Sequence, residues 1–76
     1  MAREQRIEIL AEMVANVLVV EVAVGDAVAI GDTVVLLESM KMEIPVMAEA
    51  AGTVTAVKVA VGDVVQEGDP LVELVA

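Results

Sequence analysis

The 76-residue sequence contains no cysteine and no histidine. Their absence excludes disulfides, thiolate and imidazole metal ligands, a cysteine nucleophile and the histidine base of a hydrolytic triad. A chain of this size removes only about 60% of its unfolded surface from water on folding, which leaves little room for an enclosed cleft. We therefore expect a single domain spanning residues 1–76, with residues 1–6 frayed, that is not itself an enzyme.

Aromatic residues are also absent, although 59% of the residues are hydrophobic. The core must therefore be built from Val, Ile, Leu, Ala and Met. Valine dominates this set, and its branched side chain favours strands over helices. The composition predicts an all-β domain.

Basic residues are scarce: four lysines and arginines stand against 13 aspartates and glutamates, a formal net charge of −9. Nucleic acids and anionic membranes both require a basic surface, so neither is an expected partner. No apolar run approaches the roughly 18 residues of a membrane span, and residues 1–6 precede no signal-like segment. We expect a cytoplasmic, monomeric protein.

Strand and turn signals alternate along the chain. Strands are expected at residues 7–10, 17–24 and 33–38 from their β-branched or alternating character. Shifted by 37 residues, residues 16–38 align with residues 53–75 with 12 of 23 positions identical. One strand-turn-strand unit therefore occurs twice. Two such units, each unable to bury its own face, predict a flattened β-sandwich or barrel of two quasi-twofold-related halves.

Four Gly-Asp pairs punctuate the two copies, beginning at Gly25, Gly31, Gly62 and Gly68. Glycine accepts the positive φ that tight turns need, and the aspartate can accept hydrogen bonds from nearby amides. Isolated aspartates lack the alternating ligand positions of a calcium loop. We interpret these pairs as structural turns and not as metal sites.

The repeat also predicts which strand residues face the core. Glu21 aligns with Lys58, and both charges are expected to face water. Alternation then places on the outside Val17, Val19, Ala23, Val54, Ala56 and Ala60. It places in the core Leu18, Val20, Val22, Val24, Thr55, Val57, Val59 and Val61.

Residues 39–47 join the two copies and should form a hairpin with its tip near Met40 and Lys41. A two-residue hairpin loop normally takes Gly or Asn, because both central residues need φ > 0. Neither is present, which suggests that the side chains at this tip matter more than an easy backbone conformation. Lys41 would lie far from the place where the two chain ends meet.

Two methionines, Met40 and Met42, flank this lysine, which is one of two in the chain. Exposed methionines are costly in water and commonly serve as adaptable contact surface for a partner. The pattern favours a presented lysine that a partner recognises. An ordinary solvated lysine beside core methionines is the alternative, and the residues alone leave both open.

The joint between the copies reads Glu38-Ser39-Met40-Lys41-Met42-Glu43. With this segment and the paired Val-Gly-Asp-x-Val-x-x-Gly-Asp motifs, the chain resembles the biotin/lipoyl attachment domain family over roughly residues 7–75. Members are small β-sandwiches with the modified lysine on the hairpin between two quasi-symmetric halves. Methionine on both sides of the lysine resembles the biotin type, whereas lipoyl-type domains usually carry Asp-Lys-Ala.

The resemblance implies that biotin is the cofactor, joined covalently as an amide to Lys41 by a biotin protein ligase. The ligase would recognise Met40, Met42, Glu38, Ser39 and Glu43. The amine must be neutral to attack an activated biotinyl carbonyl, and no residue of the chain is placed to deprotonate it, so activation must come from the ligase. The domain would then carry carboxybiotin between biotin carboxylase and carboxyltransferase components.

Two departures from the family pattern refine this expectation. Many biotinyl domains have Pro-Met-x-Gly before the first repeat strand, whereas residues 12–15 read Glu-Met-Val-Ala, and the second copy keeps its glycine at Gly52. No segment is left over for the protruding loop of the bacterial carrier subunit of fatty-acid synthesis. The resemblance favours a stand-alone attachment protein, or the terminal domain of a longer carboxylase.

Three functions remain open on the sequence. The first is a biotin carboxyl carrier domain, and the second is a lipoyl-bearing carrier that serves a 2-oxo acid dehydrogenase. The third is an unmodified β-domain that binds a partner through its methionine-rich tip or through exposed sheet edges. Lysine modification separates the third from the first two.

Overall fold

The computed structural model describes residues 5–76, and within them the chain is entirely strand, turn and irregular connection. The strands are β1 (Arg6–Leu10), β2 (Ala15–Val20), β3 (Ala27–Val28), β4 (Thr33–Ser39), β5 (Met42–Met47), β6 (Gly52–Val57), β7 (Val64–Val65) and β8 (Pro70–Val75). The described chain contains no helix that is long and apolar enough to cross a membrane. Most of the predicted frayed segment, residues 1–4, lies outside the described residues, whereas Arg6 belongs to β1.

The eight strands form two four-stranded antiparallel sheets, ordered β1-β8-β6-β3 and β5-β4-β2-β7. A shift of 37 residues converts the first order into the second, strand by strand. This confirms the predicted sandwich of two quasi-twofold halves. Each sheet takes two strands from each half, so the halves are interlocked and neither has a sheet of its own.

Backbone hydrogen bonds at the turns tie the two halves together. The N–H of Gly25 donates to the carbonyl of Val54 at 2.8 Å, and the N–H of Gly62 donates to the carbonyl of Val17 at 2.9 Å. The first Gly-Asp turn of each copy is therefore attached to the first repeat strand of the other copy. Glycine is needed at Gly25 because its φ is +98°.

The aspartates of the Gly-Asp pairs close these turns as predicted. Asp26 Oδ2 accepts a hydrogen bond from the N–H of Ala23 at 2.9 Å. The same bond, also at 2.9 Å, recurs at Asp32, Asp63 and Asp69. Among the described residues no group of three or more acidic side chains is arranged to hold a metal ion.

The predicted inward and outward faces are wrong at the start of each repeat strand. Val17 is only 1% exposed, although alternation placed it outside. The cause is a β-bulge in β2: Val17 pairs with Leu37 and Val19 pairs with Leu36, which leaves Leu18 as an extra residue. Beyond the bulge the prediction is confirmed, because Val20 packs on the core while Val19 is 39% exposed.

The second copy repeats this error for the same reason. Val54 is buried, and the bulge falls at Thr55, which is exposed and donates a hydrogen bond to Glu73 Oε1 at 2.9 Å. Val24 and Val61 were predicted to be inside but are 65% and 66% exposed, because the chain has already left its strand and entered the turn.

The core is purely aliphatic. Its buried members are Ala11, Ala15, Val17, Val28, Val34, Val35, Leu37, Ala48, Val54, Val65, Leu71, Val72 and Leu74. No polar or charged side chain among the described residues is buried. Stability therefore comes from packed methyl groups between the two sheets and from the backbone ladders.

The two halves differ locally where Ala15 corresponds to Gly52. A Cβ built on Gly52 would lie 2.7 Å from the carbonyl oxygen of Val75, so β6 and β8 approach too closely there for a side chain. Ala15 occupies the equivalent place in β2 and is buried. The departure from the family pattern therefore falls where the first half accommodates a side chain and the second half does not.

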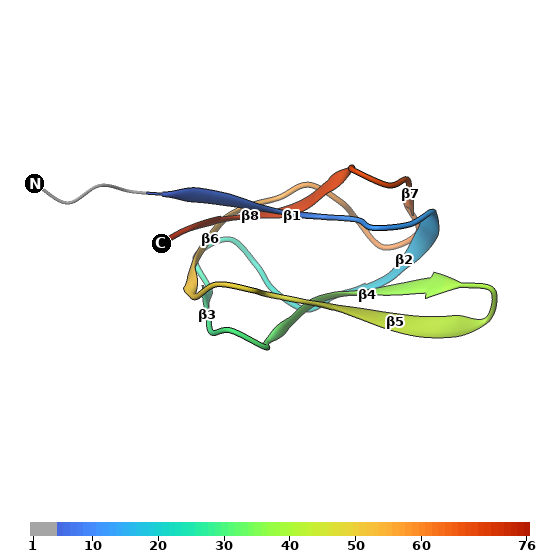
Figure 1. The fold of residues 1–76 in the computed structure, drawn as a ribbon, viewed down its shortest axis with the longest axis horizontal. Coiled ribbons are helices and arrows are strands. Elements are labelled where there is room, and N and C mark those ends of the chain that lie inside the picture. Colours follow the sequence, from blue (N-terminus) through green and yellow to red (C-terminus); the bar gives the residue numbers. More distant parts are fainter. Residues whose placement is uncertain (1–4) are drawn as a thin grey trace, which may run out of the picture.

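Gln5, the first described residue, and Ala76 lie at one end of the sandwich. Ala76 and Gln5 lie side by side there, and the N–H of Ala76 donates to the carbonyl of Gln5 at 3.0 Å. The β4–β5 hairpin projects from the opposite end (Figure 1). The predicted separation between the hairpin tip and the chain ends is confirmed.

Candidate functional site

The hairpin tip is a two-residue loop of Met40 and Lys41. Ser39 at the end of β4 pairs with Met42 at the start of β5, so only these two residues lie between the strands. Their φ values are +53° and +65°. These are the only non-glycine residues with positive φ in the described chain, and two successive positive φ values are typical of a type I′ turn. The predicted backbone conformation and its strain are both present.

The side chains of the tip project into solvent. Met40 is 91% exposed and Met42 is 62% exposed, while Lys41 is also exposed. The interpretation of these methionines as core residues is therefore wrong. The chain places an exposed amine between two exposed, apolar and polarizable thioethers.

The base of the hairpin is firmly held. Leu37 in β4 is 1% exposed and pairs with Ile44 in β5, and Val35 is fully buried opposite Val46. Ile44 and Val46 pack against the core. The tip therefore stands on a two-stranded support that is anchored in the core, while the Lys41 side chain is exposed.

Two carboxylates flank the tip on opposite strands. Glu38 is half-buried and lies directly opposite the exposed Glu43, and Ser39 between Glu38 and the tip is half-buried. Directly opposed like charges destabilise a strand pair. The tip thus combines two local costs, a strained turn and a repulsive pair, within one hairpin.

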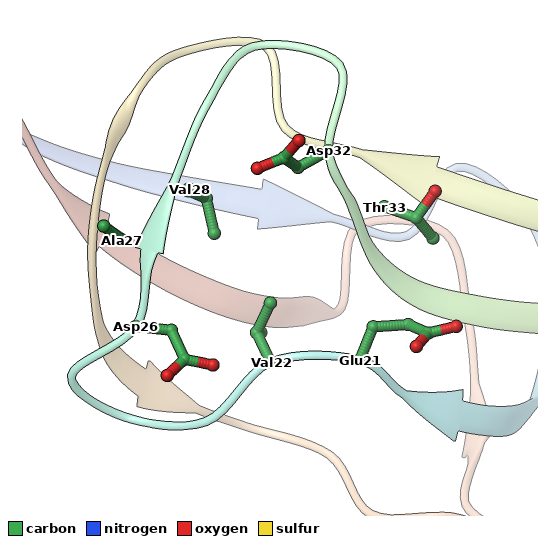
Figure 2. A pocket seen from close by; sticks show the side chains of 7 residues that line it. All are labelled: Glu21, Val22, Asp26, Ala27, Val28, Asp32 and Thr33. Atoms are coloured by element: carbon green, nitrogen blue, oxygen red, sulfur yellow. The ribbon is translucent and has the colours of Figure 1, made fainter.

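Two shallow hollows elsewhere follow from the repeat. Figure 2 shows the first, which is lined by Glu21, Val22, Asp26, Ala27, Val28, Asp32 and Thr33. The second is lined by Lys58, Val59, Asp63, Val64, Val65, Asp69 and Pro70, each 37 residues further along. The three carboxylates of the first hollow lie on different sides of it. The duplication indicates that both hollows are products of the turn architecture.

A third hollow lies between β1 and β5, the outer strands of the two sheets. Its apolar lining includes Ile7, Ile9, Ile44 and Val46. The sequence did not point to this groove, because it forms only where strands from the two halves come together. Each of its two strands carries an obstacle to further pairing: β5 contains Pro45, which has no N–H to donate, and β1 carries the exposed charge of Glu8.

The fold and the tip together define a class of domain. Two interlocked halves form a rigid support that presents one lysine at the end remote from the chain termini. A family model described as biotin-requiring enzyme matches residues 7–74. The chain belongs to this family, and the resemblance found in the sequence is confirmed.

Curated relatives match over 38 residues. The biotinylated protein TB7.3 homolog of Mycolicibacterium smegmatis and the biotinylated protein TB7.3 of Mycobacterium tuberculosis (strain H37Rv) are each 66% identical to this chain over that stretch. It covers 50% of this chain and 54% of each relative. The alignment thus spans about half the length of the relatives.

Solved structures match over nearly the whole chain. A single-chain, multi-domain long-chain acyl-CoA carboxylase matches 90% of this chain and 7% of its own, with 32% identity and a TM-score of 0.84. The Kluyveromyces lactis urea carboxylase matches 97% of this chain and 6% of its own, with 30% identity and a TM-score of 0.87. The likeness is to one small part of each carboxylase.

Proposed function

We propose that this domain is a biotin carboxyl carrier, not itself a catalyst, with biotin attached covalently to Lys41. The observation that carries the proposal is the strained two-residue turn that holds an exposed lysine between two exposed methionines. Membership of the family and the names of the relatives support biotin as the attached group. The assignment of Lys41 as the acceptor comes from its position at the tip.

The surroundings of Lys41 fit covalent attachment. The side chain is exposed on a two-residue loop, so a ligase can reach the amine. In the attachment step Nζ attacks the activated carboxyl carbon of biotin, an amide bond forms, the activating group leaves with its bonding electrons, and the amine loses a proton to the ligase or solvent. Met40 and Met42 would fill apolar contacts on the ligase while Glu38, Ser39 and Glu43 supply polar contacts at the base of the tip.

Bound biotin supplies a ring nitrogen that carries a carboxyl group. The chain contributes the rest: a rigid support, a flexible lysine arm, and a tip remote from both chain ends (Figure 1). Any chain that continues from either end leaves at the far side of the sandwich, so the tip can enter a partner's active site without the tether obstructing it. Such tethering raises the effective concentration of the carried group at both sites.

The partners we propose are a biotin protein ligase, a biotin carboxylase and a carboxyltransferase, with the domain acting as a monomer in the cytoplasm. The likeness to parts of two carboxylases supports the biotin carboxylase and carboxyltransferase partners. It also disfavours the lipoyl-bearing alternative. The alternative of partner binding through sheet edges is disfavoured by Pro45 and Glu8 in the two edge strands that line the groove.

The test is incubation of the purified chain with biotin, ATP and a biotin protein ligase, followed by intact mass and streptavidin blotting. We expect one biotinyl group on the wild type and none on Lys41→Arg. Lys58→Arg is the matched control, because Lys58 is the other lysine, is exposed, and follows β6 far along the chain from the tip. It should be labelled as the wild type is.

Labelling of Lys41→Arg would refute the site. Absence of labelling on the wild type, with labelling by a lipoate ligase instead, would replace biotin by lipoate. No modification by either enzyme would leave the domain as an unmodified binding module.

A further inference from the structure

The methionines that the structure describes differ widely in exposure. Met40 is 91% exposed and Met42 is 62% exposed, against 50% for Met47 and 37% for Met13. Among these four described methionines, the two most accessible thioethers are therefore those beside Lys41. An oxidant in solution therefore reaches the sulfurs of Met40 and Met42 more readily than those of Met47 and Met13.

Methionine is also where oxidation must concentrate in this chain. The sequence has no cysteine, histidine, tryptophan or tyrosine to compete for an oxidant. The reaction with hydrogen peroxide is a two-electron oxidation. The sulfur attacks one peroxide oxygen, an S–O bond forms as the O–O bond breaks, and water leaves after proton transfer. The product is a polar, chiral sulfoxide, which thiol-dependent methionine sulfoxide reductases return to the thioether.

We infer that Met40 and Met42 form a redox modification site, and that their oxidation by peroxides stops Lys41 from accepting biotin. The inference rests on the proposed function. The ligase would contact Met40 and Met42 as two flexible apolar side chains. After oxidation the same contacts would bury two polar sulfoxide groups, and apolar contacts offer these groups no hydrogen bond. The fold is spared, because the tip side chains lie in solvent and contribute nothing to the buried core.

The experiment treats the full chain with dilute hydrogen peroxide and measures sulfoxide at each methionine by peptide mass spectrometry. Met40 and Met42 should oxidise before Met47 and Met13. Biotin incorporation by the ligase should fall about tenfold or more, the size expected when buried polar groups are left unpaired. Far-UV circular dichroism should be unchanged, and methionine sulfoxide reductase should restore the rate.

Matched variants separate the tip from the other two methionines that the structure describes, Met13 and Met47. In the double variant Met40→Leu/Met42→Leu, the treated and untreated proteins should incorporate biotin at equal rates, whatever that rate is. The double variant Met13→Leu/Met47→Leu should keep the peroxide sensitivity of the wild type. The reverse pattern would overturn the inference.

Two other outcomes are distinct. Oxidised wild type that accepts biotin at the untreated rate would refute the inference while leaving the proposed function intact. Untreated wild type that accepts no biotin would refute the proposed function and the inference with it.

Discussion

Replacing Met40 by asparagine should make the protein more stable and, at the same time, a poorer substrate of the ligase. Met40 holds a φ of +53°. For a residue with a Cβ, the left-handed region costs roughly 1–2 kcal/mol, and asparagine is among the residues that adopt it most readily. The Met40 side chain is 91% exposed, so its removal forfeits almost no burial. We expect Met40→Asn to raise the free energy of unfolding by about 0.5–1 kcal/mol.

Thermal unfolding offers a direct measurement. For a domain of 60–100 residues, 1 kcal/mol corresponds to roughly 4–8 °C in Tm, so an increase of about 2–8 °C is expected. The unfolding must be followed by far-UV circular dichroism, because the chain has no aromatic residue for fluorescence. Biotin incorporation by the ligase, measured on the same samples, should become slower because one thioether contact is lost.

Met42→Asn is the control for this prediction. Met42 lies in β5 and has no positive φ. Asparagine is a poor strand former, so this variant should lower the Tm while it also slows biotin incorporation. If Met40→Asn lowered the Tm as Met42→Asn does, the turn would not be strained. The positive φ at Met40 would then be no indication that the side chains of the tip serve a function.

Two further changes test the packing and the charges. Val17→Ala removes methyl groups from a side chain that is 1% exposed, so it should lower the free energy of unfolding, measured in urea, by about 1–3 kcal/mol. Val19→Ala should lower it much less. Equal losses would contradict the bulge in β2. Glu43→Lys replaces the repulsion between Glu38 and Glu43 by an attraction. At low salt this should raise the free energy of unfolding by about 0.2–1 kcal/mol, and the Tm by a few degrees. That gain should shrink in high salt, and a gain that is independent of salt would point to strand propensity instead of charge.

The architecture could be predicted from the sequence because the sequence contains the same strand-turn-strand unit twice. The internal repeat fixed the symmetry, the Gly-Asp pairs fixed the turns, and the midpoint of the repeat located the hairpin. The strands β3 and β7 could not be found in this way. Each has only two residues and lies inside a turn segment, and each forms only by pairing with a strand of the other half.

The bulges could not be derived from alternation, because a bulge is a mismatch between two paired strands and not a pattern within one. The sequence did contain a signal for them. Val17, Val20 and Val22 are identical to their counterparts in the second copy, whereas Leu18 and Val19 are not. These three identical valines are buried or pack on the core. A spacing of three between Val17 and Val20, where a regular strand would have two or four, marks the extra residue.

The repeat also explains why the sandwich presents one lysine and not two. A shift of 37 residues takes the last hairpin pair, Ser39 with Met42, onto Ala76 with Gln5, which are hydrogen-bonded to each other at the opposite end. Gln5 and Ala76 therefore occupy the place that corresponds to the residues next to the hairpin tip. In the structure these two places lie at opposite ends of the sandwich, with the β4–β5 hairpin at one end and the C-terminus at the other (Figure 1). A duplicated fold thus presents a single two-residue hairpin tip, at the end of the sandwich away from Gln5 and Ala76.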